Sequence, residues 1–174
     1  MSDAPPASAN PDDDLPSTNV TVECHVHFGM TGSFPLRLAE LFFADDGLYV
    51  AEYAYITPMF GLGTKKHHRE AGAMQAIYDH HGLDEVLLQA DAVTWHNYEN
   101  VVSITVYDGG RVGRPKLTIE TASGKGHAYR LHDVSNLPSL VADLQSVGDH
   151  HGFTVTEKDG VGYSLRESVS RVFE

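Results

Sequence analysis

The run from Pro58 to Arg69 (PMFGLGTKKHHR) is the most unusual part of the sequence, because apolar residues and glycines lead directly into a basic cluster. Backbone N–H groups at the start of a helix, with lysines beside them, can hold a phosphate or a carboxylate. We therefore expect the 59–69 segment, a loop and a helix start, to be the main ligand-binding surface. Its candidate ligand-binding residues are Phe60, Lys65, Lys66, His67, His68 and Arg69.

Two other interpretations of the 59–69 segment stay open. Phe60 and Leu62 could enter a lipid surface while the cations meet headgroups, which would be a peripheral membrane contact. Alternatively, the apolar residues pack under the neighbouring helix and the basic residues pair with carboxylates. A Walker loop is excluded, because the required spacing of glycine, lysine and hydroxyl is absent.

Histidines form the second candidate site, since the chain has 11 of them. His25 and His27 fall on one face of a predicted strand, a spacing that suits two zinc ligands, with Glu23 beside them. His67 or His68 could supply a third ligand across the fold. A histidine-based metal-binding protein, with His25 and His27 as ligands, is therefore the alternative to an anion-binding protein.

Two of the three His-His pairs have a structural explanation. Each lies in an Asp-His-His-Gly tetrapeptide, at 79–82 and at 149–152, followed by an apolar residue. This pattern is typical of a helix that ends at glycine, with histidines facing the negative end of the helix dipole.

No arrangement of residues typical of catalysis is found in the sequence. Cys24, the only cysteine, belongs to an apolar strand face, where a thiol is usually inert. Asp45 and Asp46 are explained by a hairpin turn. We therefore expect no catalytic residue, no cofactor and no enzymatic activity.

The candidate residues are positioned by a mainly β chain. Alternation predicts a strand from Val20 to Phe28, and Asp45-Asp46-Gly47 predicts a hairpin between strands at 38–44 and 48–57. On the second of these strands Tyr49, Tyr53 and Tyr55 share a face, which we expect to pack beneath the next helix. The pattern then predicts a helix at 64–82, strands near 86–95, 100–107, 115–121 and 126–132, an amphipathic helix at 136–152 and a short edge strand at 153–156.

Charge and composition narrow the class of protein. The chain has 24 acidic and 12 basic residues, a net charge of −12, and few lysines. This balance favours a salt-adapted protein from a halophilic archaeon and disfavours binding to nucleic acid, which needs a positive surface. No apolar run approaches the ~18 residues of a transmembrane segment, and the first residues do not resemble a signal peptide, so we expect a cytoplasmic protein.

Three segments carry a resemblance to a known superfold: Leu41–Val50 (LFFADDGLYV), Trp95–Ile104 (WHNYENVVSI) and the helix from Asn136 to Gly152. Their order resembles the PH-like superfold, particularly the prokaryotic PH-like and GRAM-like domains. The resemblance implies a two-sheet barrel plugged by the C-terminal helix, and a role in binding lipids, peptides or partner proteins. The helix at 64–82 departs from the family pattern as an insertion.

The resulting expectation is an α+β, mainly antiparallel β protein with a PH-like barrel, a C-terminal amphipathic helix and one inserted helix. Its parts are a disordered acidic tail at 1–19, the PH-like domain at 20–156 with the insertion at about 64–82, and an extension at 157–174. We expect a non-catalytic binding or interaction module for a protein or an anionic small molecule, with homo-oligomerisation left open.

Overall fold

The computed structural model describes residues 20–32, 36–56 and 63–162. The predicted tail at 1–19 and most of the predicted extension at 157–174 lie outside these residues, so both boundaries stay predictions. The elements are β1 (Val22–Thr31), β2 (Leu36–Ala44), β3 (Gly47–Ile56), α1 (Gly63–His81), α2 (Leu83–Gln89), β4 (Ala92–His96), the 3-10 turn η2 (Tyr98–Asn100), β5 (Val101–Tyr107), β6 (Lys116–Thr121), β7 (Gly126–Leu131), α3 (Leu137–His151) and β8 (Thr154–Lys158).

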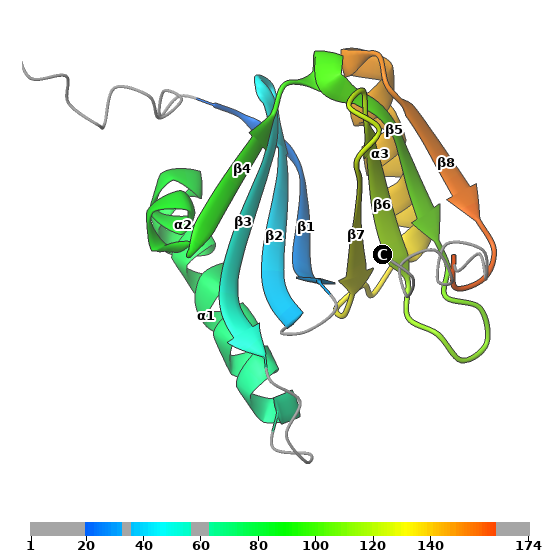
Figure 1. The fold of residues 1–174 in the computed structure, drawn as a ribbon. Coiled ribbons are helices and arrows are strands. Elements are labelled where there is room, and N and C mark those ends of the chain that lie inside the picture. The colour runs from blue at the N-terminus through cyan, green and yellow to red at the C-terminus, as the bar shows by residue number, and fades with distance from the viewer. Residues whose placement is uncertain (1–19, 33–35, 57–62, 163–174) are drawn as a thin grey trace, which may run out of the picture.

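One eight-stranded sheet contains all the described strands, in the order β4-β3-β2-β1-β7-β6-β5-β8. Every neighbouring pair is antiparallel except β5 and β8, which are parallel. The two halves of the sheet join only where Gly29 and Met30 of β1 meet Leu131 and Arg130 of β7. Figure 1 shows that the halves diverge from this junction.

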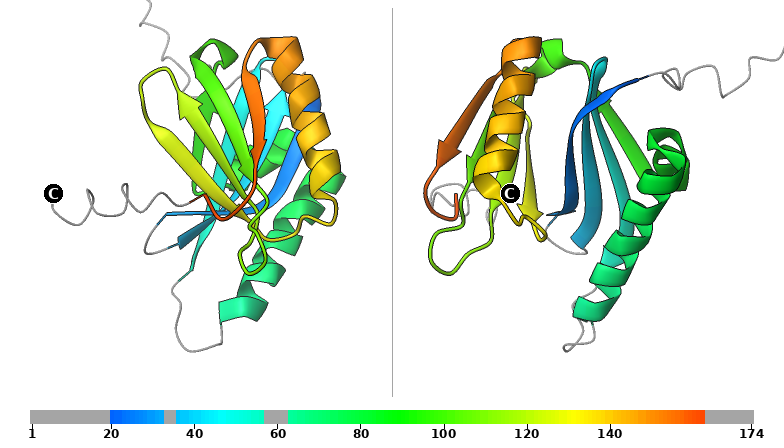
Figure 2. Two further views of the ribbon diagram at one scale, coloured as in Figure 1. Left: turned by 90° about the vertical axis from the view of Figure 1, so that its right-hand side faces the viewer. Right: turned by 180° about the vertical axis from the view of Figure 1, so that it is seen from behind.

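The helices cover different parts of this sheet. α1 and α2 lie on the outer side of β1 to β3, and α3 lies beside β1 and behind β5 to β7 (Figure 2). The β8 strand follows α3 and adds to the far edge of the sheet. None of the described helices combines the length and the apolar character needed to span a bilayer. The cytoplasmic location stays a prediction.

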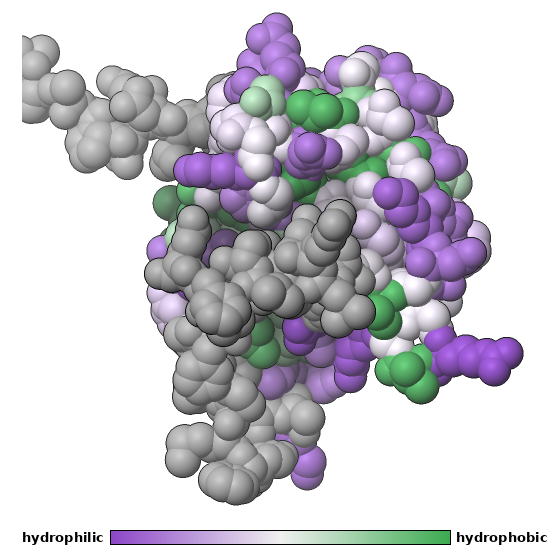
Figure 3. All heavy atoms as spheres, turned by 45° about the vertical axis from the view of Figure 1, so that its right-hand side comes forward, coloured by the Kyte–Doolittle hydropathy of each residue, from purple (hydrophilic) through white to green (hydrophobic). Residues whose placement is uncertain are grey.

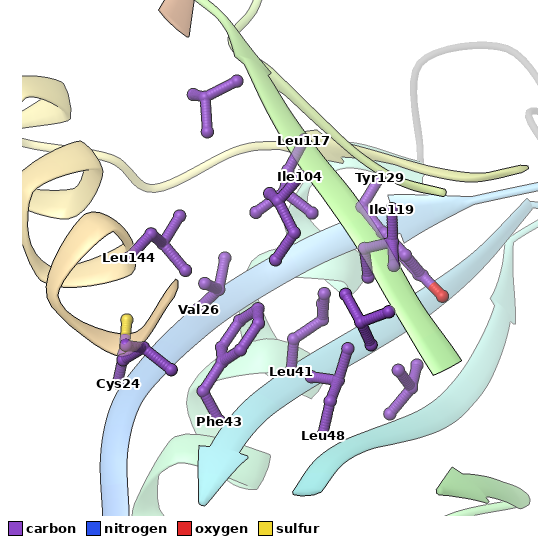
Figure 4. Packing of buried hydrophobic residues seen from close by; sticks show 14 of the residues in the cluster. Cys24, Val26, Leu41, Phe43, Leu48, Ile104, Leu117, Ile119, Tyr129 and Leu144 are labelled. Atoms are coloured by element: carbon purple, nitrogen blue, oxygen red, sulfur yellow. The ribbon is translucent and has the colours of Figure 1, made fainter. Parts of the chain in front are cut away.

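Two apolar cores result from this arrangement. The first core is enclosed between the two halves of the sheet and α3, and includes Phe43, Leu48, Ile104, Leu117 and Leu144 (Figure 4). The second core lies between β1 to β3 and the two helices α1 and α2. Strands β1 and β2 therefore bury both of their faces, which is why nearly all of β2 is buried. A polar side chain in the buried part of β2, residues 38–44, must find its partners inside the protein.

The α+β, mainly antiparallel architecture is confirmed, and the PH-like two-sheet barrel is wrong. The strands form one open sheet, whose edge strands β4 and β8 each pair with a single neighbour. The barrel was inferred from the order of elements along the chain. Order does not decide closure, because closure depends on pairing between strands far apart in sequence.

The local predictions are mostly confirmed, including the hairpin, the helix at 64–82 and the C-terminal helix. The strand predicted near 86–95 is wrong in its first half, because residues 83–89 form α2. Leu83 and Val86 are buried three residues apart, at helical spacing. A short apolar run is ambiguous by periodicity alone, and here the packing against β3 favours the helix.

The surface is mostly hydrophilic on the side of the molecule seen in Figure 3. The face seen in Figure 3 carries mostly hydrophilic and weakly coloured residues, with apolar side chains in small separate groups. Exposed apolar residues scattered in this way are normal for a folded protein. On this face they indicate no extended apolar patch among the residues that the structure describes.

Candidate metal centre

Glu40 is the polar residue around which the site is built. It lies on β2 between Leu38 and Phe42, on the face that α1 covers, and its side chain is only 1% exposed. A carboxylate in such a place is very costly unless several donors or a cation hold it. Its partners are therefore informative about function.

Four donors surround the Glu40 carboxylate. His25 Nε2 lies 2.8 Å from Oε2, and His27 Nδ1 lies 2.9 Å from Oε2 and 3.0 Å from Oε1. The Tyr53 hydroxyl donates to Oε1 at 2.5 Å, and the Phe28 backbone N–H also points at Oε1, at 3.4 Å. One oxygen is thus held mainly by Tyr53 and the backbone, while the other faces the two imidazoles.

An irregularity in β1 brings two of these donors together. Val26 pairs with Leu41 and Gly29 pairs with Ala39, so both His27 and Phe28 stand opposite Glu40. Phe28 has a φ of 54°, in the left-handed region that bulky residues seldom adopt. Strained backbone of this kind persists where the surrounding structure enforces it, often at functional sites.

Aromatic rings fix the position of His25. Its ring stacks on Phe42 at a centroid distance of 4.3 Å and an interplanar angle of 13°. On the other side Tyr78 of α1 contacts the same imidazole at 4.7 Å. The ring is therefore oriented toward Glu40 before any ligand arrives, which reduces the entropy lost on binding.

Proton equilibria at the site follow from burial and from these contacts. Burial acts to raise the pKa of Glu40, but the hydrogen bonds from His25, His27 and Tyr53 outweigh it and lower the pKa. Burial acts to lower the pKa of His27, but the hydrogen bond and the charge of Glu40 raise it overall. The site therefore holds an ionised carboxylate beside an imidazole that protonates readily.

The ligand atoms of His25, His27 and Glu40 all lie within 4.8 Å of one another. Two imidazoles and one carboxylate are a donor set that zinc enzymes and other transition-metal sites use. Around a tetrahedral ion with bonds of about 2.0–2.1 Å, ligand atoms stand about 3.4 Å apart. The observed spacings of 2.8 and 2.9 Å would have to open by about half an ångström.

A groove of about 350 Å³ borders this centre along β1. His25 and His27 line it together with Asp133, Asn136 and Asp143. A larger hollow, of about 560 Å³, lies over the outer face of β5 to β7. We place the site at the smaller groove, because the clusters of metal-ligating side chains found among the described residues do not lie in the larger one.

The predicted ligands are only partly brought together. His25 and His27 share a site as predicted, but Glu23 does not join them, and neither does His67 or His68 among the residues described. Sequence reasoning missed Glu40 and Tyr53. Glu40 carried one available signal: it is a lone acid in the apolar run Leu38-Ala39-Glu40-Leu41-Phe42.

The 59–69 segment is described only in part, and Phe60 lies outside the described residues. Lys65, Lys66 and Arg69 are exposed on the first turns of α1, and Arg69 pairs with Glu70 at 3.1 Å. The His68 ring lies edge-to-face with the Phe28 ring, at a centroid distance of 5.1 Å. The predicted anion site therefore keeps two exposed lysines and the exposed His68, whereas the Nε2 atom of His67 is buried.

Cys24 behaves as the apolar pattern predicts. It is 7% exposed in the first core, and burial raises the pKa of its thiol to about 12. The thiol is therefore protonated at neutral pH and is a poor nucleophile.

No family model matches the chain, and neither does any curated protein. Among solved structures the chain is similar to the hSac2 domain from the human phosphoinositide phosphatase Sac2. The two share 12% sequence identity with a TM-score of 0.50, over 86% of this chain and 82% of the other. This likeness concerns the fold.

Three expectations are corrected by these comparisons. The PH-like and GRAM-like resemblance is wrong, since no family model supports it and the sheet is open. The expectations of a PH-like binding module and of a halophilic source find no support in these comparisons. The expectation of no enzymatic activity is not supported either, because a solved structure with a similar fold comes from a human phosphoinositide phosphatase.

Proposed function

We propose that the protein binds a divalent transition-metal ion, of which zinc is the model case, through His25, His27 and Glu40. The observation that carries the proposal is the convergence of two imidazole nitrogens on one oxygen of a carboxylate that is 1% exposed. Imidazole suits zinc, copper, iron and nickel better than magnesium or calcium, which prefer oxygen ligands.

The surroundings of Glu40 support a ligand role for it. Tyr53 and the Phe28 N–H hold Oε1, which leaves Oε2 directed at His25 and His27. Hydrogen bonds of this kind to the outer atoms of a ligand fix its orientation and tune metal affinity. An ion here would also neutralise the buried negative charge of Glu40, which in the absence of metal raises the pKa of His27.

The test is a titration of tag-free, chelator-treated protein with zinc and with cobalt(II), followed by calorimetry and visible absorption. We expect Glu40→Gln to bind one ion fewer per chain than wild type. His27→Gln should weaken binding at the same site by at least tenfold. Circular dichroism of the metal-free variants verifies that each one folds.

The chain offers a matched control in His80 and His81, which are exposed at the end of α1. His80→Ala with His81→Ala removes as many imidazoles as changing His25 and His27 and should leave the metal content unchanged. If Glu40→Gln folds and binds zinc with wild-type stoichiometry and affinity, the proposal is wrong. The same holds if the control pair loses as much metal as His27→Gln does.

A second candidate function is the binding of a phosphorylated anion at the start of α1. Its support is that Lys65 and Lys66 are exposed there and that the first turn of α1 carries no acidic residue. The name of the similar structure, which includes a phosphoinositide phosphatase, suggests phosphoinositides as the first ligands to try. Lys65→Glu with Lys66→Glu should abolish binding to phosphoinositide vesicles, whereas Lys125→Glu with Lys158→Glu should not. Equal binding by both double variants would exclude this surface.

A further inference from the structure

A second group of metal-ligating side chains gathers on the other face of β1, where α3 ends. Glu23 Oε1 lies 2.9 Å from His151 Nε2, and Glu23 Oε2 lies 3.3 Å from His150 Nδ1. The three ligand atoms lie within 4.8 Å of one another. The donor set again consists of two imidazoles and one carboxylate. Glu23 is separated from His150 and His151 by 127 and 128 positions in the sequence.

A register shift in β1 accounts for the direction of Glu23. Strict alternation would place Glu23 on the same face as His25, toward α1. The pairing with β2 is irregular between Val22 and Cys24, so the residue between them turns toward α3 instead. Figure 2 shows α3 running alongside β1, with its last turn near the start of the strand.

His151 is held in place for this role. Its ring stacks on Tyr98 at a centroid distance of 4.0 Å, and its side chain is only 13% exposed. Tyr98 is itself fixed, because its hydroxyl donates to the Ala44 carbonyl oxygen at 2.8 Å. Because the His151 ring is held against Tyr98, its Nε2 atom is already directed at Glu23, and little side-chain entropy is lost when an ion binds.

The end of α3 also favours a cation. The helix closes at Gly152, in the left-handed conformation, with its N–H bonded to the Gly148 carbonyl. The carbonyl groups of the last turn give this end a negative potential, to which the Glu23 carboxylate adds. Hydrogen bonds from His151 and His150 hold the pKa of Glu23 below its usual value, against the opposing effect of burial.

We infer that Glu23, His150 and His151 form a second site for a divalent transition-metal ion, which ties the last turn of α3 to β1. The inference uses residues separate from His25, His27 and Glu40 and does not depend on that centre. Its consequence is structural: binding would join the helix that packs in the first core to the strand that links both cores. The helix end would then open less often when metal is present.

The sequence supplies an unusually close control. The tetrapeptide Asp-His-His-Gly occurs twice, and His80 and His81 also end a helix. Their rings lie 6.4 Å apart, and no metal-ligating group found among the described residues includes them. Both pairs have the same local sequence and helix position, but only His150 and His151 face a carboxylate, that of Glu23, and only His151 stacks on a tyrosine.

The experiment measures zinc stoichiometry and hydrogen exchange on the tag-free full chain, with and without zinc. Zinc should slow exchange of the amides at 149–153 in wild type. Glu23→Gln should weaken zinc binding at this site at least tenfold. The variant should therefore bind one ion fewer per chain, and zinc should no longer slow the exchange of the amides at 149–153. His150→Asn provides a second, surface substitution with the same expected result, and His80→Ala with His81→Ala should behave as wild type.

Each outcome decides the inference. Zinc-dependent protection of 149–153 that survives Glu23→Gln, or that is absent from wild type, overturns it. The first centre is judged separately, because Glu40→Gln should lose its own ion while keeping the protection at 149–153. If the control pair at 80–81 loses an ion as Glu23→Gln does, binding follows histidine content alone and the inference fails.

Discussion

Replacing Tyr53 with phenylalanine tests the network around Glu40 by removing a single oxygen atom. The Tyr53 hydroxyl is buried and donates to Glu40 Oε1 at 2.5 Å. The substitution keeps the ring, which packs in the second core, so no cavity of side-chain size is created. The change therefore isolates one hydrogen bond to a buried charge.

The expected loss follows from the chemistry of the acceptor. A hydrogen bond to a charged group contributes about 1.5–3 kcal/mol to the free energy of unfolding. Glu40 keeps its contacts with His25 and His27, so the loss should stay within that range rather than approach the cost of an unpaired buried carboxylate. For a chain of this length it corresponds to a fall in Tm of about 3–12 °C.

The assay is urea unfolding at pH 7 in the presence of a chelator, with the free energy of unfolding extrapolated to zero denaturant. Tyr55→Phe is the control, because Tyr55 lies on the same strand but is 49% exposed. It should change the free energy of unfolding by no more than about 0.5 kcal/mol. If Tyr53→Phe and Tyr55→Phe give the same stability, Tyr53 does not hold the Glu40 carboxylate and the network as described is refuted.

Two further predictions concern pH and helix capping. The raised pKa of His27 should make zinc affinity increase with pH through the range above the usual value of 6.5, because a proton competes with the ion, and calorimetry at pH 6 and pH 8 measures this. In metal-free protein the raised pKa of His27 stabilises the fold, fully below about pH 6.5 and less as the pH rises through the pKa of the folded state. A free energy of unfolding that increases over this pH range in the metal-free protein would contradict the prediction. Asn136→Ala should lower the free energy of unfolding by about 1 kcal/mol, because the Asn136 side chain accepts from the Ser139 N–H at the start of α3, whereas the neighbouring Ser135→Ala should have little effect in urea unfolding.

Local patterns were predictable because their causes lie within a few residues. The hairpin at Asp45-Asp46-Gly47, the two long helices and the burial of Cys24 all follow from turn chemistry, helical spacing and alternation. The prediction for the three tyrosines holds for Tyr49 and Tyr53, which pack in the second core, but not for Tyr55. The pairing of β3 with β2 is irregular at Ala54, which has a φ of 50°, and beyond this irregularity Tyr55 is 49% exposed.

Long-range pairing was not predictable from the same patterns. No local signal indicates that β1 joins β7 through two residue pairs, or that β8 lies parallel to β5. The inferred barrel failed at this level, since opening or closing a sheet depends on contacts between strands separated by most of the chain. The assignment of residues 86–89 to a strand failed for a related reason, because the packing of α2 against the sheet decided it.

The sequence by itself determined that His25 and His27 lie on one face of a strand, because side chains alternate along β structure. Only the tertiary structure decided what that face meets. Glu40 comes from the neighbouring strand, and a bulge in β1 sets two donors opposite it. A second irregularity turns Glu23 away toward His150 and His151. Register shifts of one residue exchange the faces of a strand, and no pattern within the strand reveals them.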